Sequence, residues 1–163
     1  MKPADLAVMH HFVQLPGLRM HSVQAGAGPL VVLLHGFPES WWSWRHQVQP
    51  LVEAGFRVVA PDLRGYGETQ RQGPYDLDTI VGDVCALIES LGEKQAMIVG
   101  HDWGGGVAWH LASLRPEYCK RLVVMNCPHP ALMHQALLGR KPSWAQIRKS
   151  WYFFVFMLPF FPE

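Results

Sequence analysis

The chain has 163 residues, of which 49% are hydrophobic and 17% charged, with 14 basic and 13 acidic residues. This length suits one domain with a hydrophobic core. The near-neutral balance provides no basic surface for nucleic acid and no polybasic stretch for an anionic membrane, so neither is predicted as a partner.

The first half of the chain predicts a hairpin, then a buried strand, a helix and a second buried strand. Two β-prone stretches, 11–15 and 19–24, flank Pro16–Gly17 and predict a hairpin. The apolar run PLVVLLHG, which ends at Gly36, predicts a buried strand, and a helix is expected from Ser40 to about Ala54. The next strand is FRVVAPDL, which is followed by the glycine-containing turn RGYGE.

The second half continues the alternation of helices and strands. Apolar residues recur at helical spacing over 78–91, and Gly92 is expected to end that helix. Strands are predicted at 96–99 and 121–126, with a helix over 104–114 between them. This alternation predicts the α/β class, with a mostly parallel sheet covered by helices on both faces.

Three motifs fall at the carboxyl ends of predicted strands, where parallel sheets carry their catalytic and ligand-binding residues. They are His35–Gly36, Asp62 and Asp102. Because the carboxyl ends of parallel strands meet at one edge, we expect these three motifs to share one rim of the sheet.

The stretch VGHDWGGG, residues 99–106, has the pattern of a nucleophile elbow, with Asp102 where serine is usual. A carboxylate that attacks a saturated carbon forms an ester that water can open, whereas serine would form a stable ether. Aspartate side chains are also ionised at neutral pH and need no base to attack. The pattern predicts displacement at an sp³ carbon followed by ester hydrolysis. The alternative is that Asp102 only caps the following helix.

The ends of the chain and its cysteines bear on localisation. Cys85, Cys119 and Cys127 lack metal-ligand spacing, are odd in number, and suit a reducing compartment as small apolar filler. The first residues contain no apolar signal core, so we predict a cytoplasmic protein. The apolar segment at 151–161 is interrupted by Pro159 and is shorter than the roughly 20 residues that span a bilayer.

Three motifs together resemble the α/β-hydrolase fold and, within it, the epoxide hydrolases. They are HGFPESWWSWR at 35–45, PDLRGYGET at 61–69 and GHDWGG at 100–105, and NCPHP at 126–130 resembles the family's exit into a helical cap. The resemblance implies a core over residues 1–130 and the start of a cap over 131–163. It implies hydrolysis of epoxides to diols by water through an ester on Asp102, without a cofactor.

The same resemblance assigns roles to further residues. The backbone N–H groups of Phe37 and Trp103 would form the oxyanion hole. Pro38 would line the substrate pocket after a cis Phe37–Pro38 bond. Tyr152, in the cap segment 150–159, would donate a proton to the opening epoxide.

The family's base histidine, its acid, a second cap tyrosine and the last strands of the sheet would all follow Glu163. Some members of the family place the acid directly after the strand that ends near residue 126, but this position is Asn126 here. We therefore expect a truncated sheet, and no turnover by residues 1–163 alone.

Two other functions stay open. A haloalkane dehalogenase would use the same aspartate, although Phe37 stands where such enzymes commonly hold halide. A truncated, inactive product could instead bind a ligand or partner through an exposed sheet edge.

Two local alternatives concern side chains near these motifs. His35 and His101 beside Asp102 could suggest a metal, but they lack ligand spacing, so no metal is predicted and loop-shaping hydrogen bonds are preferred. The tryptophans at 41, 42 and 44 could form a stacking platform, but packing is the preferred role.

Overall fold

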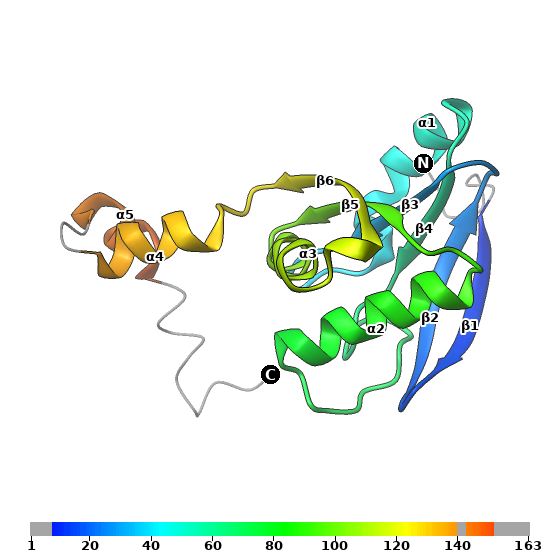
Figure 1. Ribbon diagram of the computed structural model, residues 1–163, viewed down its shortest axis with the longest axis horizontal. Helices are drawn as coiled ribbons and strands as arrows, with labels where there is room; N and C mark the ends of the chain where they lie inside the picture. The colour runs from blue at the N-terminus through cyan, green and yellow to red at the C-terminus, as the bar shows by residue number, and fades with distance from the viewer. Residues whose placement is uncertain (1–7, 140–142, 152–163) are drawn as a thin grey trace. The chain divides into compact units, whose positions relative to one another are not determined.

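The computed structural model describes residues 8–139 and 143–151 (Figure 1). These residues form a six-stranded sheet in the order β1-β2-β4-β3-β5-β6. The strands are β1 (Met9–Leu15), β2 (Leu18–Ala25), β3 (Leu30–Leu34), β4 (Arg57–Pro61), β5 (Ala96–His101) and β6 (Cys119–Met125). The β1–β2 hairpin pairs antiparallel with β4, and the other pairs are parallel. The predicted α/β class and hairpin are confirmed.

The three predicted helices of the core are present with shifted ends, and three further helical segments of the described chain follow them. They are η2 (Trp41–Trp44), α1 (Arg45–Glu53), α2 (Leu77–Ser90), α3 (Trp103–Leu114), η3 (Pro116–Tyr118), α4 (Pro130–Leu138) and α5 (Trp144–Lys149). The predicted helix from Ser40 begins as a 3₁₀ turn, because the N–H of Ser43 donates to the carbonyl of Ser40, three residues back. Strand β5 also runs to His101, two residues beyond its predicted end.

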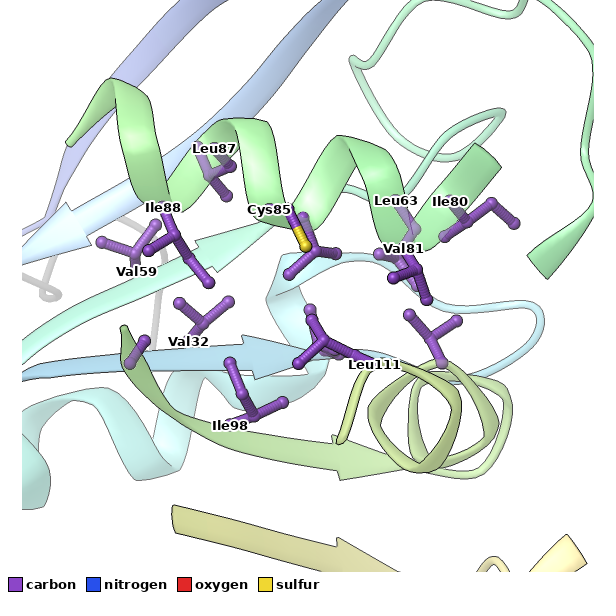
Figure 2. Packing of buried hydrophobic residues seen from close by; sticks show 14 of the residues in the cluster. Val32, Val59, Leu63, Ile80, Val81, Cys85, Leu87, Ile88, Ile98 and Leu111 are labelled. Carbon is purple, nitrogen blue, oxygen red and sulfur yellow. The ribbon is translucent and has the colours of Figure 1, made fainter. Parts of the chain in front are cut away.

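Alternating residues of the buried strands pack on opposite faces of the sheet. Val31 and Leu33 of β3 join one cluster with Trp44 and Val48. Val32 joins the other cluster, which contains residues of α2 and α3 (Figure 2). This period of two explains why β3 is apolar throughout, since both of its faces are covered. The packing role predicted for the tryptophans is confirmed for Trp44, which is buried.

The cysteines of the described chain are free thiols. Cys85 belongs to α2, and its side chain lies in the core (Figure 2). Burial raises the pKa of its thiol to about 11. Cys85 therefore serves as the apolar filler that the sequence predicts, because a protonated, buried thiol is a poor nucleophile.

The chain divides into two compact units, the first ending at Cys127 and the second beginning at Pro128. In the second unit, His129 caps α4 by accepting from the N–H of Ala131, and Ser143 caps α5. The predicted boundary at residue 130 and the cap role of 131–163 stay predictions. Over the described ranges, no helix is both long and apolar enough to cross a membrane.

Candidate active site

The turn between β5 and α3 is built around two glycines that admit no side chain. A Cβ on Gly100 would lie 2.3 Å from the carbonyl oxygen of Gly104, and one on Gly104 would lie 2.3 Å from that of Leu34. Between them Asp102 adopts φ 50° and ψ −116°, a conformation rare for residues other than glycine. The close approach of backbone to backbone therefore holds Asp102 on a tight strand-to-helix turn.

The carboxylate of Asp102 is held through one of its two oxygens. Its Oδ1 accepts hydrogen bonds from the backbone N–H of Trp103 at 2.7 Å and of Phe37 at 3.1 Å. Its Oδ2 accepts no hydrogen bond from the part of the chain that the structure describes. The structure thus brings together three residues predicted for the site, Asp102, Phe37 and Trp103. The hydrogen bond from Trp103 also satisfies the first backbone N–H group of α3. It therefore agrees as well with the alternative that Asp102 only caps this helix.

The loop after β3 is fixed by a residue that the sequence analysis did not single out. The N–H of Gly36 donates to Glu39 Oε2 at 2.9 Å, and the N–H of Glu39 donates back to the Gly36 carbonyl. The same carboxylate oxygen lies 3.5 Å from Nδ1 of His101. Glu39 thereby connects the loop that carries Phe37 to the end of β5. The sequence alone does not reveal this role of Glu39, because its contact with His101 depends on the pairing of β3 with β5.

The Phe37–Pro38 bond is cis, as the resemblance implies. Pro38 lines a shallow, open depression whose other lining residues come from its own loop and the following helix. Its role in a substrate pocket stays a prediction. Tyr152 lies outside the described residues.

His35 is fully buried and ties the ends of β3 and β4 together. Its Nε2 accepts from the N–H of Leu63 at 3.0 Å, so its Nδ1 must carry the proton that is donated to the Gly36 carbonyl at 2.8 Å. Both ring nitrogens are therefore engaged, and His35 has no lone pair left for a metal. The loop-shaping role predicted for His35 is confirmed.

Burial lowers the pKa of His35 below its ordinary 6.5, against a hydrogen bond to Gly36 that raises it. The unfolded chain therefore binds the proton more readily, and the free energy of unfolding should fall as pH drops below about 6.5. Urea denaturation between pH 7 and 5 would measure this slope. His35→Asn should be less stable at pH 7 and should show a smaller slope. An unchanged slope would assign the pH dependence to another group.

Asp62 organises the rim from a buried position. It accepts hydrogen bonds from Nδ1 of His21 at 2.8 Å and from the N–H groups of Trp41 and Glu68 at 2.8 and 3.0 Å. Burial alone would raise the pKa of Asp62, but these hydrogen bonds, that of His21 first, outweigh it and lower the pKa. Asp62 is thus a structural anion that holds the start of η2 and the turn after β4. The sequence predicts Asp62 on the rim, whereas its partner His21 follows only from the pairing of β2 with β4.

Comparisons with known proteins agree with this arrangement. A family model described as the alpha/beta hydrolase fold matches residues 29–154. The chain is 46% identical over 157 residues to the AB hydrolase superfamily protein YfhM of Bacillus subtilis and 46% identical over 162 residues to epoxide hydrolase 4 of Homo sapiens. These matches cover 93% and 94% of this chain but 54% and 43% of the relatives. The chain therefore spans about half the length of the relatives it matches.

The solved structures give the same result. Epoxide hydrolase VrEH1 from Vigna radiata superposes with a TM-score of 0.73 at 44% identity, covering 81% of this chain and 47% of that one. This degree of likeness extends the agreement from the sequence to the course of the backbone.

Proposed function

We propose, because this chain belongs to the α/β-hydrolase fold family, that it carries the nucleophile of an enzyme that hydrolyses epoxides to diols. The human relative and the Vigna radiata structure bear the name epoxide hydrolase, which supports this substrate class. The observation that carries the proposal is the different environment of the two oxygens of Asp102. Two N–H groups hold Oδ1, while Oδ2 accepts no hydrogen bond within the described residues and can attack.

In the first step, Oδ2 of Asp102 attacks a ring carbon of the epoxide. A new carbon–oxygen bond forms as the strained ring bond breaks, and the departing oxygen takes a proton from an acid. We assign that acid to Tyr152, following the resemblance. The product is an ester between Asp102 and a β-hydroxyalkyl group.

In the second step, water attacks the carboxyl carbon of this ester. The negative charge that develops on Oδ1 is stabilised by the N–H groups of Phe37 and Trp103, which already lie within hydrogen-bond distance of that oxygen. Collapse breaks the bond between the carboxyl carbon and Oδ2, which takes one proton of the water and leaves in the diol. The other proton of the water restores the acid of the first step, and the carboxylate is regenerated. No histidine of residues 8–127 is hydrogen-bonded to Asp102. We therefore assign activation of the water to a residue outside this range.

The substrate class can be tested on the complete protein with a panel of terminal epoxides and a matched panel of 1-haloalkanes. Diol formation, measured by mass spectrometry, is expected from the epoxides, without halide release from the haloalkanes. Halide release without diol formation would instead support the haloalkane dehalogenase alternative.

Replacing Tyr152 by phenylalanine in the complete protein should slow ring opening and leave ester hydrolysis unchanged. General acids typically contribute 10²–10⁴-fold, and a loss of about 10²-fold or less is expected if a second tyrosine shares the role. Stopped-flow measurement of the two steps separates them, with Trp151→Phe as a control for packing in the same segment. Unchanged alkylation kinetics in Tyr152→Phe would assign Tyr152 to packing.

We also infer a cytoplasmic location, which the free thiols of the described chain support. Water and a small epoxide are the partners that the mechanism requires. Neither a metal nor an organic cofactor enters either step.

A further inference from the structure

A second cluster of ionisable side chains lies at the hairpin edge of the sheet, away from Asp102 in the strand order. Of the side chains that the structure describes, one group of histidine, cysteine and acidic residues has ligand atoms all within 4.8 Å of one another, and it consists of His10, His21 and Glu68. The mechanism proposed above uses none of these three side chains.

The register of the hairpin brings the two histidines together. Phe12 of β1 pairs with His21 of β2, and His10 pairs with Val23. His10 and His21 are therefore diagonal neighbours on one face of the hairpin. Their rings lie with centroids 5.1 Å apart, and His10 Nδ1 is 2.9 Å from His21 Nε2.

The tautomer of His21 is set by the buried Asp62. Asp62 also accepts two backbone N–H groups, which stabilise it as a carboxylate, so Nδ1 of His21 must donate to it at 2.8 Å. In the neutral imidazole, Nε2 of His21 then carries a lone pair, which accepts the hydrogen bond from Nδ1 of His10. A metal ion between the two nitrogens would take the place of that proton. A histidine whose second nitrogen donates to a carboxylate is the arrangement that orients metal-binding imidazoles in proteins.

We propose that His10, His21 and Glu68 bind a divalent transition metal ion, with Zn²⁺ as the best fit. Two imidazoles and one carboxylate are ligands that zinc accepts, and a water would complete a tetrahedron.

The distances require only small movements. Two nitrogens on one tetrahedral Zn²⁺, each about 2.05 Å from the ion, lie about 3.3 Å apart. The pair His10–His21 must widen slightly from 2.9 Å, and Oε1 of Glu68 must approach His21 Nε2 from 3.9 Å. Both moving side chains are exposed, whereas His21 is buried and fixed. The ring of Trp41, edge-on to His10 at 5.4 Å, limits where that imidazole can move.

A bound ion would join three segments, β1, β2 and the turn after β4. Because only the folded chain brings these ligands together, the ion would stabilise the fold by RT ln(1 + c/Kd), where c is the free Zn²⁺ concentration, so the stabilisation rises with c. The site is therefore structural, and its ligands differ from those of the proposed reaction.

The test is titration of the complete, metal-stripped protein with Zn²⁺ alone. Calorimetry measures the stoichiometry and affinity, and thermal unfolding with and without Zn²⁺ measures the shift of the midpoint. We expect one equivalent to bind and the midpoint to rise. His10→Gln and Glu68→Gln, which change exposed side chains, should each weaken Zn²⁺ binding at least tenfold. His46→Gln alters an exposed histidine outside the cluster and should leave the affinity unchanged.

Cysteines are alternative zinc ligands, so the titration should be repeated after alkylation of accessible thiols. Binding that survives alkylation and is lost in the His10 and Glu68 variants supports the site. Three results would overturn it: no stoichiometric binding, a Zn²⁺ affinity in the two variants equal to that of the unchanged protein, or loss of binding on alkylation. Co²⁺ substitution gives a further readout, because a tetrahedral site with nitrogen ligands should produce a visible absorption band that the His10 variant lacks.

Discussion

Replacing Asp102 by alanine is expected to abolish epoxide hydrolysis, with a loss on the order of 10⁶-fold, as found when a catalytic nucleophile is removed from an enzyme. No other carboxylate accepts the N–H groups of Phe37 and Trp103 among the described residues. Asp102→Ser should be equally inactive in turnover, because a serine could form only an ether with the substrate. Initial rates of diol formation would measure both variants.

The matched control is Asp78→Ala, which removes a carboxylate that is 76% exposed and paired with His110 on the outside of the molecule. Its rate should stay within a small factor of the unchanged protein. Both Asp102 variants should stay folded, since the turn is shaped by backbone contacts, and Asp102→Ala should lose about 1 kcal/mol of stability with the acceptor of two N–H groups. Appreciable turnover by folded Asp102→Ala would mean that the carboxylate caps α3 and does no chemistry.

Alanine at Gly104 is expected to cost about 3 kcal/mol or more of folding free energy. The added Cβ would lie 2.3 Å and 2.5 Å from the carbonyl oxygens of Leu34 and His35, and backbone atoms of a buried strand cannot move aside cheaply. Gly106 is the matched control on the same helix. A Cβ there meets nothing within 4 Å, so Gly106→Ala should stabilise the protein by about 0.5–1 kcal/mol.

Urea denaturation of the two variants gives the comparison directly. Opposite signs are expected, although the chemical change is identical and the positions are two residues apart. Equal effects on stability would show that the approach of α3 to β3 does not shape the elbow.

Local patterns predict much of this fold because they report short-range physics. The period-two packing of Val31 and Val32 and the apolar spacing of α2 follow from burial on known faces. The glycines around Asp102 likewise predict the elbow, although only the close contact of Gly100 with Gly104 is local and that of Gly104 with Leu34 joins distant segments. The 3₁₀ start at Trp41 does not follow from such patterns, because apolar spacing does not distinguish hydrogen bonds three residues apart from those four apart.

Contacts between segments that are distant in sequence could not be predicted in the same way. The link from Glu39 to His101 exists because β3 lies beside β5, and that from His21 to Asp62 because β2 lies beside β4. Strand order decides both, and no spacing within the sequence encodes it. The two backbone donors on Asp102 were predicted only through a family resemblance, since an N–H group leaves no trace in side-chain identity.

The central claim, that Asp102 forms a covalent ester, is tested most directly by a single turnover in ¹⁸O-labelled water with the complete protein in excess over epoxide. Water attack on the ester places its oxygen on the carboxyl carbon and releases a diol that carries Oδ2. Mass spectrometry of the peptide that contains Asp102 should therefore show one ¹⁸O, and the diol should contain none. Labelled diol with an unlabelled Asp102 would contradict the claim, because water would then have attacked the epoxide itself.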